Sequence, residues 1–179
     1  MDDLFREALW RQFGSAIDML GDALADCPDS LWDEPVWPET PPEWFAPNFA
    51  HFWYVVYHSL VWLDLYLEGR PEDEFAPPQH FRQGEVDSPE TMPERPYTKE
   101  QLGDYLQLLR VKCREKLVRL TAEDAGQTVQ YGWSADERVT YAELLLYNLR
   151  HVQGHAAQLS LFLGSHGVPS RDWVARVPD

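Results

Sequence analysis

The chain has 179 residues, of which 44% are hydrophobic and 13% aromatic. This composition excludes a disordered or low-complexity protein, and the length fits a single domain, residues 1–179, that buries a core without disulfide bonds. The 30 acidic and 15 basic residues give a formal net charge of −15, which would repel a phosphate backbone. We therefore expect no nucleic-acid partner.

Two further features bear on the compartment of the protein. The first residues, MDDLFREALW, lack the basic and apolar regions of a secretory signal, and no apolar run is long enough to span a membrane. The two cysteines, Cys27 and Cys113, are too few for a disulfide framework. These features favour a cytoplasmic protein with no membrane partner.

Residues 3–26 form the first predicted element. Apolar residues recur there at spacings of three and four, the pattern of an amphipathic helix: Phe5, Leu9, Phe13, Ile17, Leu20 and Leu24. The helix should end at Cys27, because a residue before proline resists the α conformation. Residues 28–47 hold six prolines and three tryptophans, which predicts a loop packed over one end of a helical bundle.

The second predicted helix spans residues 48–68. Its apolar residues occupy most faces, which indicates a central and heavily buried helix, and Gly69 is a suitable helix stop. Residues 70–97 then form a long connection with six prolines, which can carry the chain from one end of a bundle to the other. The helices before and after it can therefore run parallel.

The third predicted helix follows Thr98, which begins the capping-box sequence TKEQ, and continues to about residue 120. Cys113 lies on its apolar stripe, and we interpret it as a small buried hydrophobic residue and not a reactive thiol. Five basic residues cluster on this segment: Arg110, Lys112, Arg114, Lys116 and Arg119. Since residues 12–69 hold no Lys or Arg, the cluster indicates a helix face opposite an acidic neighbour; the alternative is an anion site.

The fourth predicted helix spans residues 140–163. It begins with a second capping-box sequence, TYAE, which gives Glu143 a structural role, and Gly164 follows as a natural stop. No segment shows strand-like alternation of useful length. Together these segments predict an all-α protein, a four-helix bundle with a proline-rich crossover between its second and third helices.

Six histidines are present, and two of them form the motif HVQGH. His151 and His155 are four residues apart, about 40° around a helix, so both side chains point the same way. The apolar stripe that they share also holds Leu144, Asn148, Leu159 and Phe162. Buried imidazoles need partners, and a divalent metal ion is one partner that uses both. The spacing also occurs by chance, and the glutamate of the HExxH pattern is absent.

A third ligand would come from the second predicted helix, which holds His51 and His58 on nearly the same face. His58 lies mid-helix and is better placed to meet the middle of a neighbouring helix, so we choose His58, with His51 as the alternative. The competing interpretation of His58 is a core histidine bonded to a carbonyl or a tyrosine. His80 and His166 lie in loop or tail sequence, where chance placement accounts for them.

The segments HFWYVVYHSLVWLDLYL and NLRHVQGHAAQLSLFL resemble the DinB/YfiT-like superfamily, and the resemblance covers most of the chain. It implies a four-helix bundle with up-down-down-up topology and a divalent metal, often zinc or nickel, bound by His58, His151 and His155. It also implies a homodimer. Many members look like transferases that use a low-molecular-weight thiol, and others resemble hydrolases or isomerases.

Three histidine ligands leave at least one coordination position open, which is the pattern of a catalytic metal. Water or a thiol at that position loses its proton near neutral pH and becomes a nucleophile. The candidate catalytic residues are Tyr54, one turn before His58; Asn148, one turn before His151; and Gln158, which lies where it can support His155.

We therefore expect a metal-dependent enzyme for a small-molecule substrate, with thiol transfer to an electrophile as the first hypothesis and hydrolysis as the second. Two alternatives stay open. One is a non-catalytic bundle in which a metal staples the second and fourth helices together. The other is an interaction protein that binds its partner through the tryptophan-rich loop, residues 31–45. Three imidazoles suit several divalent ions, so they do not identify the metal.

Overall fold

The structure is a computed structural model that describes residues 3–37, 47–81, 92–130, 138–169 and 171–178. Its long helices are α1 (Asp3–Asp26), α2 (Phe52–Glu68), α3 (Lys99–Arg119) and α5 (Tyr141–Ser165). The shorter elements are the 3-10 turns η1 (Asp29–Leu31), η2 (Pro47–Ala50) and η3 (Glu72–Glu74), the helix α4 (Ala122–Gly126) and the strands β1 (Thr128–Gln130) and β2 (Arg138–Thr140). The predicted all-α class is confirmed, with one small two-stranded sheet among the described residues.

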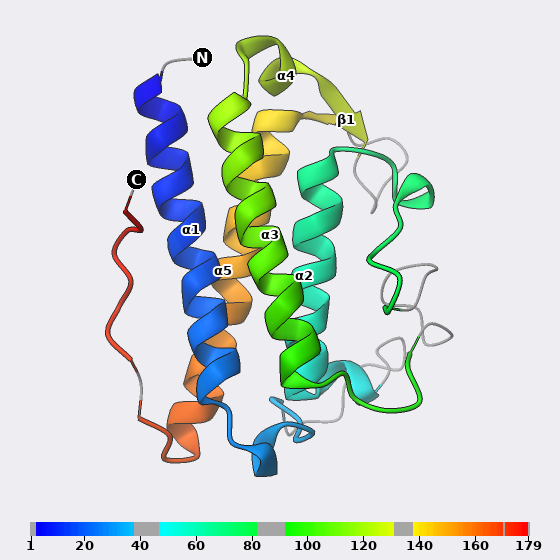
Figure 1. Cartoon of the computed structure of the whole chain (residues 1–179), viewed down its shortest axis with the longest axis vertical. Coiled ribbons are helices and arrows are strands. Elements are labelled where there is room, and N and C mark those ends of the chain that lie inside the picture. The colour runs from blue at the N-terminus through cyan, green and yellow to red at the C-terminus, as the bar shows by residue number, and fades with distance from the viewer. Residues whose placement is uncertain (1–2, 38–46, 82–91, 131–137, 170, 179) are drawn as a thin grey trace.

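The four long helices lie side by side (Figure 1). α1 packs against α3 and α5, and α2 packs against the same two helices. In the view of Figure 1, α1 and α5 run downwards whereas α2 and α3 run upwards, so two helices that follow one another along the chain point the same way. Part of the connection between them, residues 82–91, lies outside the described residues.

Capping residues set the starts of two helices where the sequence places them. At α3 the Thr98 hydroxyl accepts a hydrogen bond from the Gln101 backbone, and the Gln101 side chain accepts one from the Thr98 backbone. At α5 the Thr140 hydroxyl accepts a hydrogen bond from the Glu143 backbone. These bonds satisfy amide groups that the first helical turn leaves without partners.

Two other helix ends differ from the prediction. α2 begins at Phe52, later than the predicted residue 48, because residues 47–50 form a 3-10 turn and His51 is the N-cap. α5 continues to Ser165, because the glycine in the left-handed conformation is Gly167, with φ 78°, and not Gly164.

Gly69 ends α2 as predicted, and the structure shows why a glycine is needed there. Its φ of 65° is left-handed, and a Cβ atom at this position would lie 2.9 Å from the Tyr141 ring. The Tyr141 hydroxyl in turn donates to the Leu67 carbonyl oxygen at 2.7 Å. This close approach and this hydrogen bond hold the end of α2 against the start of α5.

α2 is the central helix that the sequence predicts, because all its residues except His58 and Glu68 are buried. The largest fully buried side chains include Phe13, Ile17 and Leu20 of α1, Leu102, Leu109 and Leu117 of α3, and Leu145 and Leu159 of α5. Cys113 is fully buried, which confirms its role in the core. None of the helices in the described part of the chain combines the length and apolarity that a membrane crossing requires.

Three basic residues of α3, Arg110, Lys112 and Lys116, pair with acidic residues of α1 and α2. Arg110 contacts Asp18 at 2.6 Å, and Lys112 contacts the buried Asp64 at 2.5 Å and also Glu68. Part of the uneven charge distribution of the sequence is thus paired between helices. Burial acts to lower the pKa of Lys112, but its hydrogen bonds with the two carboxylates outweigh burial and raise that pKa.

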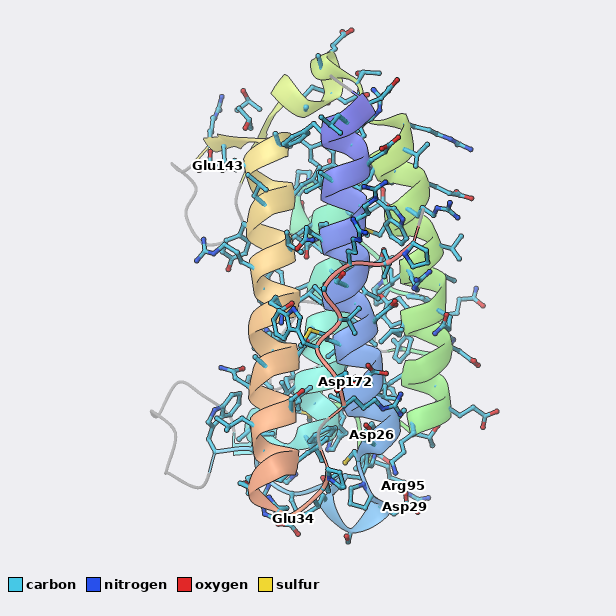
Figure 2. The ribbon with its side chains drawn as sticks, turned by 90° about the vertical axis from the view of Figure 1, so that its left-hand side faces the viewer. Asp26, Asp29, Glu34, Arg95, Glu143 and Asp172 are labelled. Atoms are coloured by element: carbon cyan, nitrogen blue, oxygen red, sulfur yellow. The ribbon has the colours of Figure 1, made fainter. Side chains whose placement is uncertain are left out.

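Three features of the fold carried too little sequence signal to be predicted. β1 and β2 pair antiparallel, with Thr128 opposite Thr140, and each strand is too short to show alternation. The helix α4 forms a single turn before them. The C-terminal segment, residues 171–178, crosses α1, as Figure 2 shows around Asp172, and Arg171 forms ion pairs with Asp22 and Asp26.

The described part of the proline-rich loop packs over one end of the bundle. Trp32 donates its indole N–H to the Tyr97 carbonyl at 2.9 Å, just before α3. The Phe52 amide, at the start of α2, donates to the Glu34 carbonyl at 2.9 Å. Asp29, Glu34 and Arg95 lie together at the lower end of the molecule in Figure 2. The rest of the predicted interaction loop, residues 38–45, lies outside the described residues.

Candidate metal centre

Three histidines meet halfway along the bundle, where α2 packs against α5. We call His58, His151 and His155 the histidine cluster. The Nε2 atom of His151 lies 3.0 Å from Nε2 of His58 and 3.1 Å from Nε2 of His155. One candidate ligand nitrogen from each ring lies within 4.8 Å of the others, and all three residues are half-buried. The structure therefore brings together the three residues that the sequence selects.

The donor set of the histidine cluster fits a divalent metal ion. Zinc–nitrogen bonds of about 2.0–2.1 Å at tetrahedral angles place ligand nitrogens about 3.3 Å apart, close to the two distances observed. Each neutral imidazole has one protonated nitrogen and one nitrogen with a lone pair. Lone pairs that converge on one point repel one another unless a proton or a cation lies between them. A divalent metal ion can accept all of these lone pairs at once.

Gln158 holds one of the imidazoles in a defined state. Its side-chain oxygen lies 2.8 Å from Nδ1 of His155, three residues earlier on α5. Because a carboxamide oxygen only accepts, a hydrogen bond at this contact requires the tautomer with the ring proton on Nδ1, in which the lone pair is on Nε2. Gln158 thus supports the cluster; a catalytic role for it stays a prediction.

The other two candidate residues take part in helix packing. Asn148 is fully buried, and its amide donates to the Leu63 carbonyl of α2 at 3.2 Å, which ties α5 to α2. Tyr54 is 3% exposed and stacks on Phe49 at 4.6 Å between ring centroids, within the main core. Their catalytic roles also stay predictions.

The remaining histidines lie elsewhere in the described structure. His51, the alternative third ligand, caps α2, and its Nδ1 lies 2.8 Å from Asp33, which also accepts a hydrogen bond from the Trp53 indole. His166 caps α5 against the Phe162 carbonyl, and the ring of His80 packs on Phe81. Only His58 of the two histidines on the second predicted helix joins the cluster.

An aromatic layer next to the histidine cluster was not predicted. The rings of Tyr66 and Tyr147 meet edge to face at 5.5 Å, and each lies 6.3 Å from the ring of His151. Trp62 lies between His58 and Tyr66 on α2, at 6.2 and 5.2 Å. Helical spacing places these residues on the faces that carry the histidines, but it does not give the register between the two helices.

Burial raises the pKa of one tyrosine near the site and of both cysteines in the core. Burial raises the pKa of Tyr147, and a hydrogen bond from Tyr66 and the charge of Arg150 only partly oppose this. Burial also raises the pKa of the Cys27 thiol to about 11 and that of the Cys113 thiol further. Neither cysteine can therefore supply a thiolate near neutral pH.

The fold and the site together define a class of protein: a helical protein with a three-histidine cluster suited to a divalent metal. A family model for the DinB superfamily matches residues 7–159, a range that contains the whole histidine cluster and Gln158. The chain belongs to the DinB superfamily. No curated protein and no solved structure matches it.

Proposed function

We propose that the chain is a divalent-metal-dependent enzyme that transfers a low-molecular-weight thiol to an electrophilic small molecule. The observation that carries the proposal is the convergence of three histidine Nε2 atoms, at 3.0 and 3.1 Å, on a half-buried site between α2 and α5. Membership of the DinB superfamily, many of whose members look like thiol-dependent transferases, supports it.

The residues of the chain would each have a separate task. His58 would hold the metal from α2, and His151 and His155 would hold it from α5. Gln158 would keep the His155 ring in the tautomer that donates its Nε2 lone pair. When bound, the ion supplies an open position at which a thiol or water loses its proton near neutral pH.

The buried state of both cysteines favours an external thiol as the nucleophile. Cys27 is 2% exposed and Cys113 is fully buried, and burial raises the pKa of each thiol. A thiol from solution can instead reach the half-buried histidine cluster. Its proton would pass to solvent and its sulfur would form a bond to the electrophilic carbon, while the bond from that carbon to the leaving group breaks and the group departs with the electron pair.

Zinc or nickel is the metal that we propose, because neutral imidazole suits both. We also propose the up-down-down-up bundle topology of the family, which agrees with the helix directions in Figure 1. A homodimer and a cytoplasmic location remain parts of the proposal that rest on resemblance and composition.

Metal analysis of protein purified without a histidine tag or chelator tests the metal site. We expect about one equivalent of divalent metal in the wild type, and a loss of at least about 100-fold in affinity in each of His58→Ala, His151→Ala and His155→Ala. His51→Ala is the matched control, because His51 lies on the same helix but binds Asp33. Metal loss in His51→Ala and not in His58→Ala would contradict the ligand set.

Turnover then separates an enzyme from a metal-stapled bundle. The metal-loaded protein is incubated with bacillithiol, mycothiol or glutathione and an electrophilic probe such as monochlorobimane. Formation of the thioether product is expected only with metal present and only while the histidine cluster is intact. Metal binding without turnover of any thiol would favour the non-catalytic alternative.

A further inference from the structure

The faces of α2 and α5 that carry the histidines also carry a layer of tyrosines. Tyr147 lies one turn before His151 on α5, and Tyr66 lies two turns after His58 on α2. The helices are antiparallel, so both tyrosines fall on the same side of the histidine cluster and their rings meet at 5.5 Å.

This layer belongs to a second apolar cluster, separate from the main core. Its buried members are Trp62, Leu65, Tyr66 and Leu144, with Tyr147 packed at its edge. Tyr66 is 5% exposed, whereas Tyr147 is half-buried, as are the three histidines. Tyr147 is therefore the member of the layer that is both next to the cluster and within reach of a ligand.

The Tyr66 ring meets the Tyr147 ring edge to face, and hydrogen bonding with the Tyr66 side chain acts to lower the pKa of Tyr147 against the stronger effect of burial. A hydroxyl inside an apolar cluster is costly without a partner, so this hydrogen bonding fixes the position of the Tyr147 oxygen. Tyr147 still carries a proton of its own. Its ring is nearly parallel to that of His151, at an interplanar angle of 13°, so it flanks the histidine along one side.

We propose that Tyr147 contacts the substrate: its ring forms a wall beside His151, and its hydroxyl, oriented by Tyr66, donates a hydrogen bond to the thiol sulfur that binds at the histidine cluster. The inference rests on the proposed metal-dependent function. Tyr147 is then a substrate-binding residue and Tyr66 a positioning residue. The site would favour ligands in which the atom that binds the metal also accepts a hydrogen bond.

The test measures thiol binding to protein loaded with Co²⁺, using 2-mercaptoethanol as the probe. The near-ultraviolet absorption band that arises when sulfur joins Co²⁺ reports both the dissociation constant and the electron density on sulfur. Tyr147→Phe keeps the ring and removes the hydroxyl. We expect its dissociation constant to rise about tenfold and the band to move to longer wavelength, because a hydrogen bond to a charged acceptor is lost.

Two further variants make the result specific. Tyr66→Phe leaves the Tyr147 hydroxyl but removes the group that orients it, and we expect a smaller rise, about threefold. Tyr57→Phe is the matched control on α2: its ring packs in the main core against Phe81 and Tyr97, and we expect wild-type binding. Co²⁺ stoichiometry, measured for every variant, shows that the histidine cluster is intact.

Unchanged dissociation constants and band positions in Tyr147→Phe at full Co²⁺ loading would overturn the role of Tyr147. If that variant does not fold, Tyr66→Phe decides, and wild-type behaviour there would overturn the inference. A wild type that binds no Co²⁺ would remove the metal function itself, and this inference with it. If the wild type binds Co²⁺ but Tyr147→Phe has no effect, the role of Tyr147 is wrong while the proposed metal function stands.

Discussion

α2 presents a polar cluster to each of two neighbouring helices, and the two clusters are built in opposite ways. Toward α3, the buried Asp64 accepts hydrogen bonds from Tyr105 at 2.7 Å and Lys112 at 2.5 Å, so acid, base and hydroxyl satisfy one another. Toward α5, the histidine cluster sets three groups of the same kind together. The first cluster joins groups of complementary charge, whereas the donor set of the second is compatible with a divalent metal ion.

The two clusters also differ in how far their side chains are exposed to solvent. Asp64 is 4% exposed and sits behind its partners, whereas every member of the histidine cluster is half-buried. A polar group whose partners all lie in the chain can be sealed from water, but a group whose partner arrives from solution must stay within reach. The contrast agrees with a stabilising role for the α2–α3 cluster and with the metal-binding role that we propose for the α2–α5 cluster.

The largest effect that tests this contrast is expected from Lys112→Met. The change leaves the Asp64 carboxylate buried without its cation, which costs about 3 kcal/mol of unfolding free energy by urea denaturation. Lys116→Met is the matched control one turn further on: Lys116 is more exposed and lies 3.5 Å from Glu68, so we expect less than about 1 kcal/mol. Metal stoichiometry should not change in either variant. Equal losses, or loss of metal in Lys112→Met, would contradict the division.

The sequence predicted what depends on local spacing. The hydroxyl of Thr98 and the side chain of Gln101 are three residues apart, and His151 and His155 are four apart, so each pair is set by helix geometry alone. His58 was selected because a mid-helix residue meets mid-helix residues of a neighbour, and the structure groups it with the other two histidines.

What depends on the register between helices could not be predicted. Tyr66 and Tyr147 lie on the correct faces, but only the relative height of α2 and α5 brings them into one layer. Asn148 lies on the same face of α5 as His151, but its side-chain amide donates a hydrogen bond to the Leu63 carbonyl. No sequence pattern predicts that contact. The β1–β2 pair is likewise too short for its pattern to differ from that of a loop.

A smaller effect is expected at the edge of the histidine cluster, from Gln158→Leu. The substitution removes the acceptor at 2.8 Å that fixes the His155 tautomer, so metal affinity should fall about 10-fold to 100-fold in competition with a chelator. Gln158 is exposed, and we expect the unfolding free energy of the metal-free protein to change by less than about 0.5 kcal/mol. Gln153→Leu is the control, since Gln153 faces Met19 of α1. Equal affinities of the two variants would count against the role of Gln158.

The smallest effect concerns the pH dependence of the α2–α3 cluster. Burial acts to raise the pKa of Glu68, but the hydrogen bond and charge of Lys112 and the charge of Lys116 outweigh it and lower that pKa below its ordinary 4.5. A carboxyl whose pKa falls on folding stabilises the fold above its unfolded pKa, and the contribution is lost as the pH falls through the folded pKa. At neutral pH the unfolding free energy of the wild type should therefore be higher than that of Glu68→Gln. The difference should be less than about 1 kcal/mol, because the Glu68–Lys112 pair is partly exposed. It should vanish at acidic pH. Urea denaturation of both proteins across that range measures it, and a difference that grows as the pH falls would show that Glu68 is not held by these lysines.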